Sequence, residues 1–233
     1  MLDVERQNEI LRLLQEGGSL RVSDLAARLY VSTPTVRRDL RILEEQGVVM
    51  RTHGGVLLRQ TTEREIPLSY REDRNNASKR QIAERAANLV HDGDVIFLDA
   101  SSTVAYLVPH LERFRDVIVV TNSPKTSLRL GELGIKNYCT GGWMLRHSIA
   151  YVGSETERFV AGINADVFFF SSRGYTEGGS ITDSSVEEAS VRRAMLKNAR
   201  RAYYLCDSSK RGKTYAYNIC ATGDVDGIIS DEA

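Results

Sequence analysis

Apolar residues recur at helical spacing in consecutive stretches at the start of the chain. Residues 4–16 predict a first helix, which the pair Gly17-Gly18 ends because glycine favours the backbone conformation that follows a helix. Residues 24–29 predict a short second helix with Ser23 as its N-cap. A third helix follows after a tight turn. The apolar residues expected to face the core are Ile10, Leu13, Leu14, Leu25, Ala26, Leu29, Val36, Leu40 and Leu43.

The third predicted helix carries a cluster of arginines opposite its apolar stripe. Residues 32–41 read Ser-Thr-Pro-Thr-Val-Arg-Arg-Asp-Leu-Arg, where Ser32 or Thr33 can act as the N-cap and Pro34 suits the first turn. At about 100° per residue, the guanidinium groups share the side away from the apolar residues. Such a face fits the phosphates and guanine edges of a DNA major groove, although a solvated helix face gives the same pattern. The arginines are Arg37, Arg38 and Arg41.

The succession of helix, short helix, tight turn and basic helix is the layout of a helix-turn-helix, and a predicted hairpin follows it. Residues 48–53 and 56–58 are strand-like and flank the turn signal Gly54-Gly55. This hairpin is typical of a β-wing, whose tip can contact the DNA backbone or the minor groove. A polar loop residue without a partner is an equally good interpretation of His53. The residues predicted to contact DNA are Ser32, Thr33, Thr35, Arg37, Arg38, Arg41, Arg51 and His53.

One acidic residue of the third helix calls for a partner. Asp39 lies toward the apolar side of the helix, about 60° from the apolar stripe. A carboxylate in that position is costly unless it is paired, and Arg6 on the first helix is a candidate partner. We hypothesise that this pair orients the basic helix without contacting DNA. A capping or solvated Asp39 is the open alternative.

The composition of the chain says less about which function the protein has than these local patterns do. The chain has 31 basic and 31 acidic residues and a formal net charge of zero, so the DNA hypothesis depends on local clustering. No apolar run reaches the length of a membrane span, and the N-terminus lacks the apolar core of a signal peptide. Cys139, Cys206 and Cys220 are an odd number without metal-like spacing. We therefore expect reduced thiols in a cytoplasmic protein, with no metal and no cofactor.

The pattern changes after a polar stretch at residues 59–76, which we expect to link a domain at residues 1–58 to a second domain at residues 77–233. Helices and strands then alternate, which predicts an α/β domain with a mostly parallel sheet covered by helices. The expected helices cover residues 77–90, 103–111, 123–130 and 186–198. The expected strands cover residues 95–98, 117–121, 136–139, 167–170 and 202–206.

Small and polar residues follow the strands of this predicted sheet, at the edge where such sheets bind ligands. Hydroxyls directly before a helix favour an anion, although Ser and Thr are also ordinary helix caps. We expect Asp99 to hold sugar hydroxyls or loop donors, because it would repel a phosphate. The lone Trp143 is expected to pack in the core rather than against a ligand or the domain surface. The residues predicted to bind an effector are Asp99, Ser101, Ser102, Thr103, Thr121, Asn122, Gly141, Gly142, Gly174 and Lys210.

The N-terminal residues and their spacing match a known family at several separate points. The matching positions are Arg6, Ile10, Leu14, Ser32, the run Thr35-Val36-Arg37-Arg38-Asp39-Leu40 and the run Arg51-Thr52-His53-Gly54-Gly55-Val56. This pattern resembles the DeoR family of bacterial transcriptional regulators. The resemblance implies a DNA-binding N-terminal domain joined to a C-terminal sensor for a phosphorylated sugar or a related metabolite.

The C-terminal part is similar to the DeoR sensor domain from about residue 77 to the end. The matching segments are residues 99–103, 120–122, 141–142, 152–153, 186–189 and 207–210. The resemblance implies a fold like that of ribose-5-phosphate isomerase and the coenzyme A transferases, with Ser101, Ser102 and Thr103 holding phosphate and Lys210 assisting. One stretch departs from the family, because residues 171–175 read Ser-Ser-Arg-Gly-Tyr where small residues are usual. This departure changes either the choice of effector or the pocket itself.

These interpretations combine into a metabolite-responsive regulator that represses a carbohydrate-metabolism operon. We expect it to bind double-stranded operator DNA as a homo-oligomer, either a dimer or a tetramer, and to be neither an enzyme nor a membrane-bound protein. The first alternative is a sugar-phosphate isomerase or transferase with an accessory N-terminal domain, with Asp99, Glu187 and Asp207 as candidate acids or bases. The second alternative is an interaction protein that uses its winged helix for protein contacts.

Overall fold

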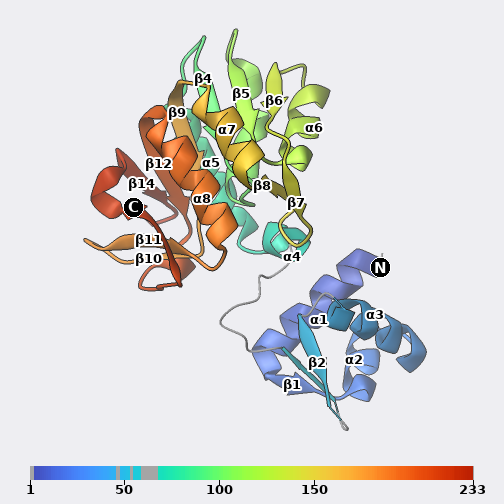
Figure 1. The fold of residues 1–233 in the computed structure, drawn as a ribbon. Coiled ribbons are helices and arrows are strands. Elements are labelled where there is room, and N and C mark those ends of the chain that lie inside the picture. Colours follow the sequence, from blue (N-terminus) through green and yellow to red (C-terminus); the bar gives the residue numbers. More distant parts are fainter. Residues whose placement is uncertain (1–2, 46–47, 53–54, 59–67, 233) are drawn as a thin grey trace. The chain divides into compact units, whose positions relative to one another are not determined.

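The chain forms two compact units, Met1–Arg74 (unit 1) and Asn75–Ala233 (unit 2) (Figure 1). The computed structural model describes residues 3–45, 48–52, 55–58 and 68–232. The short helix α4 (Leu68–Asp73) lies within the stretch 59–76 that the sequence predicts as a linker. No helix in these described ranges combines the length and the apolar character needed to cross a membrane.

In unit 1, the helices α1 (Asp3–Gly17), α2 (Val22–Leu29) and α3 (Thr33–Glu45) enclose one apolar core. Every residue predicted to face inward from these helices is buried, with an exposed fraction of 7 % or less. The prediction that Ser23 caps the second helix is wrong. The helix begins one residue before Ser23 and takes Arg21 as its N-cap, without a capping bond from the side chain.

A small antiparallel sheet completes unit 1, with β1 (Ser19–Leu20), β2 (Val49–Arg51) and β3 (Val56–Leu58) in the order β1-β3-β2. The hairpin of β2 and β3 confirms the predicted wing. The sequence did not predict β1, because two residues are too few to show the alternation of a strand. The side chain of His53, predicted to contact DNA, lies outside the described residues.

A buried ion pair joins α1 to α3. Arg6 Nε lies 2.6 Å from Asp39 Oδ2, and a terminal nitrogen of Arg6 donates to Asp39 Oδ1 at 3.0 Å. The two side chains are 8 % and 1 % exposed, which confirms the hypothesised pair and rules out a solvated Asp39. Hydrogen bonds to Asp39 and then to Asp3 raise the pKa of Arg6 above its ordinary value despite its burial. The guanidinium therefore stays charged near neutral pH.

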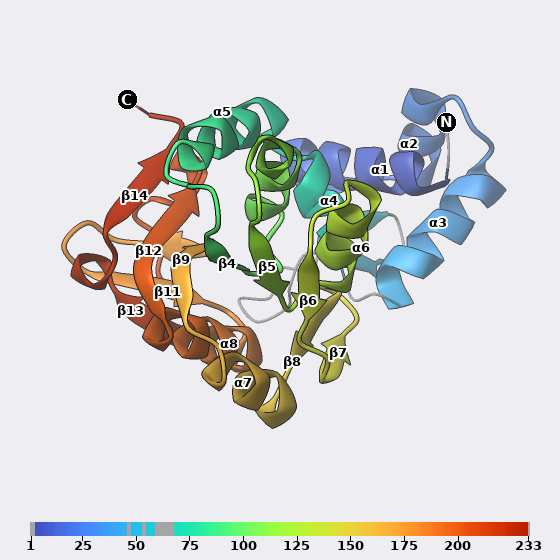
Figure 2. The same cartoon turned by 90° about the horizontal axis from the view of Figure 1, so that it is seen from above.

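Unit 2 is built on a parallel sheet with the strand order β14-β12-β9-β4-β5-β6 (Figure 2). Its strands are β4 (Val95–Leu98), β5 (Ile118–Thr121), β6 (Asn137–Cys139), β9 (Ala165–Phe170), β12 (Ala199–Cys206) and β14 (Gly227–Ser230). The predicted α/β class with a parallel sheet is confirmed. All the strands point the same way, so the loops that follow them gather at one edge of the sheet.

Helices cover both faces of this sheet, and each face has its own apolar core. One face packs against α5 (Asn76–Ala87), η1 (Val104–Arg113) and α6 (Pro124–Glu132). The other face packs against α7 (Ser154–Ala161) and α8 (Val186–Lys197). The helix expected at residues 103–111 is a 3-10 helix, η1, with Pro109 inside it. Proline lacks the N–H that an α-helix would need at that position.

Several short elements at the margins of unit 2 were not predicted. A hairpin is formed by β7 (Trp143–Leu145) and β8 (Ala150–Val152). A second sheet contains β10 (Gly174–Tyr175), β11 (Ser180–Asp183) and β13 (Tyr217–Ala221), and single turns of 3-10 helix form η2 (Ser208–Lys210) and η3 (Thr222–Asp224). The expectation that Trp143 packs in the core is wrong, because this side chain in β7 is 66 % exposed.

The cysteines all carry free thiols, with Cys206 buried and both Cys139 and Cys220 half-buried. Burial raises the pKa of Cys206 and that of Cys220 to about 12, so both thiols stay protonated near neutral pH.

Asp39→Asn is expected to lower the free energy of unfolding of unit 1 by about 3 kcal/mol, because the guanidinium of Arg6 loses its buried carboxylate partner and keeps only the exposed carboxylate of Asp3. Hydrogen exchange of the α1 and α3 amides in the full-length protein measures this loss for unit 1 alone.

The matched control is Glu9→Gln, which breaks the more exposed ion pair between Glu9 and Arg12. That change is expected to cost at most about 1 kcal/mol. If Asp39→Asn left exchange protection intact and abolished DNA binding, Asp39 would act on DNA directly and the orienting role would be wrong.

Candidate functional site

The start of α3 is fixed by a side-chain cap and a strained turn. Ser32 Oγ accepts a hydrogen bond from Thr35 N at 3.3 Å and lies 2.8 Å from Thr35 Oγ1. Before it, Tyr30 adopts a left-handed conformation with φ 54°, which turns the chain from α2 into α3. Thr33 is exposed and Thr35 half-exposed at this end of the helix. The cap predicted at Ser32 is therefore present, and the hydroxyl-bearing end of the helix faces solvent.

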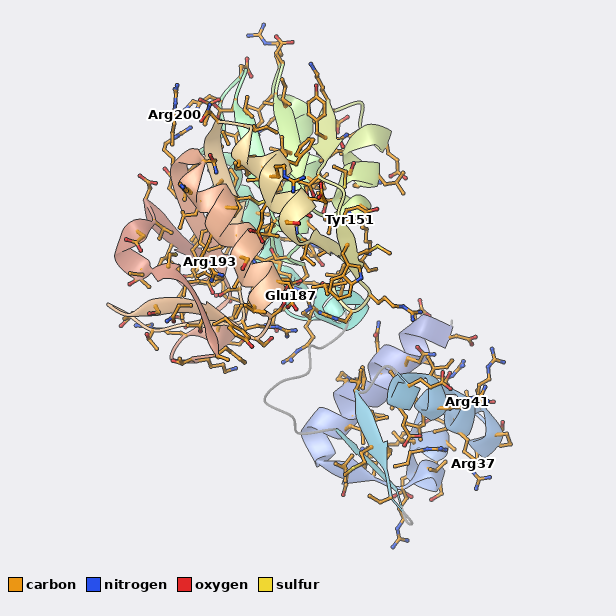
Figure 3. The ribbon with its side chains drawn as sticks, viewed as in Figure 1. Arg37, Arg41, Tyr151, Glu187, Arg193 and Arg200 are labelled. Atoms are coloured by element: carbon orange, nitrogen blue, oxygen red, sulfur yellow. The ribbon has the colours of Figure 1, made fainter. Side chains whose placement is uncertain are left out.

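The arginines of α3 form an exposed basic face, as the sequence predicts. The side chains of Arg38 and Arg41 are each 66 % exposed, and Arg37 is exposed as well (Figure 3). Arg38 contacts Asp3 at 3.4 Å and Arg41 contacts Glu45 at 3.9 Å. Exposed pairs at such distances contribute little to stability. The guanidinium groups can therefore exchange these partners for phosphate oxygens at small cost.

A groove of about 600 Å³ runs between α3, the start of α2 and the wing. Arg51 of the wing is held there by Glu44, whose carboxylate accepts from Arg51 Nε at 2.8 Å and from its backbone N at 3.4 Å. Sequence reasoning missed Arg21, Ser23 and Glu44, whose places on this groove depend on how the wing folds back. The lining residues are Arg21, Val22, Ser23, Thr33, Arg37, Glu44, Arg51, Thr52 and Gly55.

At the other candidate site, in unit 2, Asp99 follows β4 and is almost fully buried. Asp99 Oδ1 accepts from Ser101 N at 3.1 Å, and Asp99 Oδ2 accepts from Ser171 N at 3.3 Å. Arg192 Nε donates to the same Oδ2 at 2.7 Å. The expectation that Asp99 holds loop donors is thus met, and Asp99 also pairs with a guanidinium that the sequence did not predict.

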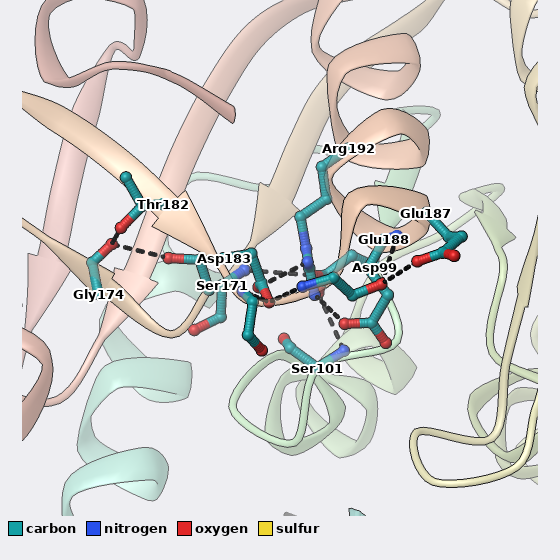
Figure 4. Close-up of polar contacts among 12 residues, drawn as sticks. Asp99, Ser101, Ser171, Gly174, Thr182, Asp183, Glu187, Glu188 and Arg192 are labelled. Atoms are coloured by element: carbon teal, nitrogen blue, oxygen red, sulfur yellow. Dashed lines mark hydrogen bonds and ion pairs between the residues drawn. The ribbon is translucent and has the colours of Figure 1, made fainter. Parts of the chain in front are cut away.

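Arg192 of α8 joins several elements behind this loop (Figure 4). Besides Asp99, it contacts Asp183 at the end of β11 at 2.8 Å and Glu188 at 3.5 Å. Burial alone lowers the pKa of Arg192, but attraction to Asp183, Asp99 and Glu188 outweighs it and raises the pKa above its ordinary value. Sequence reasoning missed this cluster, because Glu188 and Arg192 also read as an ordinary exposed pair at helical spacing.

The residues that follow Asp99 provide hydroxyls before η1. Ser101 Oγ accepts from Val104 N at 3.3 Å, so this hydroxyl acts as a cap. Ser102 and Thr103 are buried, and Thr103 Oγ1 has no hydrogen-bond partner in the part of the chain that the structure describes. The segment therefore fits both interpretations that the sequence left open. The hydroxyl of Ser101 caps the helix, and the hydroxyl of Thr103 remains able to bind a ligand.

Lys210 lies at the same edge of the sheet, after β12. Its Nζ donates to Ser171 Oγ at 2.6 Å, which joins the loop after β12 to the loop after β9. Nearby, Asp207 accepts hydrogen bonds from Ser209 and from Asn75 Nδ2. Burial raises the pKa of Asp207, but Lys210, Ser209 and Asn75 together outweigh it and leave the pKa below its ordinary value. Asp207 is therefore a carboxylate at neutral pH.

The loop after β5 is tied to the β7–β8 hairpin. Thr121 Oγ1 accepts from Ser123 N at 3.1 Å. Asn122 Nδ2 donates to Tyr151 O at 2.9 Å, and Tyr151 N donates to Asn122 O at 2.7 Å. Thr121 and Asn122 are buried, next to the end of β4 in the sheet register. The predicted residues after β4 and β5 are thus brought together.

The predicted glycines are placed in different ways. Gly141 O accepts from Thr156 Oγ1 at 2.7 Å, and an added Cβ at Gly142 would lie 2.2 Å from that same hydroxyl oxygen. Gly174 opens β10, where an added Cβ would lie 2.4 Å from Lys213 O. Close packing thus explains the glycines at Gly142 and Gly174. In the ranges that the structure describes, no cluster of His, Cys, Asp or Glu is arranged to hold a metal ion.

Comparison with known proteins covers both units. The DeoR-like helix-turn-helix domain matches residues 6–62, and the DeoR C terminal sensor domain matches residues 74–232. The HTH-type transcriptional regulator GolR of Listeria innocua is 33 % identical over 99 % of this chain and 91 % of its own length. The lactose phosphotransferase system repressor of Staphylococcus epidermidis is 33 % identical over 97 % of this chain and 91 % of its own length.

Two solved structures align with part of this chain at low sequence identity. The eIF2B delta structure from Chaetomium thermophilum is 17 % identical and aligns with a TM-score of 0.52, over 69 % of this chain and 58 % of that one. A ribose 5-phosphate isomerase A from Methanocaldococcus jannaschii is 18 % identical and aligns with a TM-score of 0.45, over 59 % of this chain and 55 % of that one. The sequence relatives, which span nearly the whole chain, decide the family. The chain belongs to the DeoR family of helix-turn-helix transcriptional regulators.

Proposed function

We propose that this regulator represses a carbohydrate-metabolism operon under the control of a phosphorylated sugar or a related metabolite. DNA binding by this protein is supported above all by the exposed arginine face of α3, which lies beside a groove lined by Arg21, Arg37 and Arg51. The name of the lactose phosphotransferase system repressor supports the carbohydrate half. The relatives are named as regulators, which favours this function over the alternative of an isomerase or transferase.

On DNA, α3 enters the major groove, and the wing contacts the adjacent backbone. Arg37, Arg38 and Arg41 supply donors for phosphates and guanine edges, while Thr33 and Thr35 lie at the end of the helix that leads into the groove. The lining of the groove adds Arg21 and Arg51 to the set predicted from sequence. A homodimer places two such helices on two half-sites about one helical turn apart. We therefore propose a homo-oligomer, either a dimer or a tetramer.

In unit 2, the phosphate of the effector binds where the loops after β4, β9 and β12 meet. Lys210 supplies a positive charge, and the hydroxyls of Ser102 and Thr103 supply donors. Both carboxylate oxygens of Asp99 are engaged by Ser101 N, Ser171 N and Arg192, so Asp99 is held by the protein rather than presented to the phosphate. The effector changes DNA binding only through different affinities for the DNA-competent and DNA-incompetent states.

Arg37→Ala is expected to weaken binding to a specific duplex by about 10- to 100-fold, because one arginine contact to a base edge is lost. The probe is a duplex that the wild-type protein selects from random-sequence DNA, and the affinity is measured by fluorescence anisotropy between about 50 and 200 mM salt. The variant keeps its thermal midpoint, because Arg37 is exposed.

The control for this experiment is Arg12→Ala, which removes an exposed arginine of α1 that pairs with Glu9. It is expected to leave the affinity unchanged. Equal affinities for Arg37→Ala and wild type, or a wild-type protein that selects no duplex, would contradict the role of α3.

Lys210→Ala is expected to raise the dissociation constant for a phosphorylated sugar by about 10- to 100-fold, because a charged hydrogen bond to phosphate is lost. Thermal unfolding is measured with glucose 6-phosphate, fructose 1-phosphate, fructose 6-phosphate and ribose 5-phosphate, each beside its unphosphorylated sugar. A ligand that binds the folded state raises the midpoint by mass action. Lys213→Ala, which removes an exposed lysine nearby, is the control and keeps the full shift. An unchanged shift in Lys210→Ala would retire the assignment of Lys210.

A further inference from the structure

The loop of the β7–β8 hairpin contains a buried serine hydroxyl that forms no hydrogen bond in the described part of the chain. Ser148 lies between β7 and β8 and is 0 % exposed. Its Oγ has no hydrogen-bond partner among the residues that the structure describes. The next residue, Ile149, has a φ of 49°, which is an outlier for a β-branched residue. The part of the chain that the structure describes thus buries this hydroxyl without giving it a hydrogen bond.

Two residues of the candidate effector site share this property. Thr103 Oγ1 and Asn122 Oδ1 are buried and also lack a hydrogen-bond partner within the described part of the chain. Thr103 is 1 % exposed and Asn122 is 3 % exposed. Buried polar atoms in folded proteins nearly always have a partner, because leaving one unpaired is costly. Such atoms in one region indicate a place where a ligand completes the hydrogen bonds.

The hairpin and the strand ends are held together by direct contacts. Leu98 of β4 pairs with Thr121 of β5, so the loop that leads to Thr103 and the loop that holds Asn122 leave adjacent strands. Asn122 exchanges hydrogen bonds with Tyr151, which stands three residues after Ser148. The unpartnered atoms of Thr103 and Asn122 therefore belong to one edge of the sheet, and Ser148 stands in the turn of the hairpin that Asn122 contacts.

The chemistry of Asn122 defines the part of the ligand that this wall receives. Its Nδ2 already donates to Tyr151 O, which fixes the orientation of the amide and leaves Oδ1 as an acceptor. A phosphate dianion has no proton to donate to that oxygen, whereas a sugar hydroxyl has one. A hydroxyl can in turn accept a hydrogen bond from Ser148 Oγ.

We propose that Ser148 is an effector-binding residue and that, with Asn122, it binds the hydroxyl-bearing end of a phosphorylated sugar. The phosphate of that ligand points to Lys210, Ser102 and Thr103. This inference rests on the proposed function, because it takes the effector site of unit 2 as given. It adds the β7–β8 hairpin, which sequence reasoning did not include, to the walls of that site.

The test compares Ser148→Ala with Ser172→Ala in the full-length protein. Both serines are buried, but Ser172 Oγ contacts Tyr204 Oη at 2.8 Å and Gly174 O at 3.2 Å. Ser172→Ala should therefore lower the thermal midpoint of the free protein, because it removes a hydroxyl that is bonded in the fold, and it serves as the stability control. Ser148→Ala should leave that midpoint unchanged or raise it, because it removes a hydroxyl that forms no hydrogen bond with any residue that the structure describes.

The second readout is the dissociation constant for whichever of the four sugar phosphates stabilises the wild-type protein most. Ser148→Ala is expected to raise it by about 10-fold, the loss of one hydrogen bond to the ligand. A dissociation constant within about twofold of the wild-type value overturns the inference whichever way the midpoint moves. A midpoint lowered as far as in Ser172→Ala also overturns it, since the hydroxyl then serves the fold.

The measurements distinguish a failure of the proposed effector site from a failure of the proposed role of Ser148. If none of the four sugar phosphates stabilises the wild-type protein, the effector half of the proposed function fails and the role of Ser148 fails with it. If the wild-type protein and Ser148→Ala respond equally while Lys210→Ala does not respond, the effector site stands and only the role of Ser148 is wrong.

Discussion

The orientation of the DNA-binding surface depends on one buried ion pair, between Arg6 of α1 and Asp39 of α3. Asp39 sits on the inner side of the helix whose outer side carries the arginines, so its carboxylate needs a partner inside the core. Arg6 meets both oxygens of that carboxylate, which fixes the rotation of α3 about its axis as well as its distance from α1. Apolar packing alone tolerates small rotations of a helix, whereas a bidentate pair restricts them.

Unit 2 also contains a buried arginine with carboxylate partners, but there the ion pairs lie beside the proposed effector site. Arg192 is buried among Asp99, Asp183 and Glu188, which come from the loop after β4, the end of β11 and α8. The guanidinium joins these elements and offsets part of their combined negative charge beside the proposed phosphate position. The carboxylate of Asp99 is thereby held by protein donors within a loop that presents hydroxyls to the proposed anion. In both units a buried arginine supports a surface that it does not itself form.

Local sequence signals predicted α3, the wing and the parallel strands β4, β5, β6, β9 and β12, because each depends on neighbours a few residues apart, but they did not predict the edge strand β14. The Arg6–Asp39 pair was also predictable, since a carboxylate beside an apolar stripe calls for a cation. The Arg192 cluster was not, because Asp99 and Asp183 reach it only through the folding of distant strands. Elements as short as β1 and β10 carry no periodicity, and the exposure of Trp143 contradicts the usual fate of tryptophan. No sequence pattern pointed to Ser148, because what distinguishes it is a hydrogen bond that its buried hydroxyl lacks among the described residues.

We propose that DNA binds to the arginine face of unit 1 and that a phosphorylated sugar binds at one edge of the sheet in unit 2. Hydrogen–deuterium exchange on the full-length protein tests both assignments in one experiment, with a selected duplex and with a stabilising sugar phosphate added separately. The account predicts that the duplex protects α3 and the wing, and that the sugar phosphate protects residues 99–103, 122 and 207–210 with the β7–β8 hairpin. Protection of other surfaces by these ligands, with α3 and these loops unchanged, would contradict it.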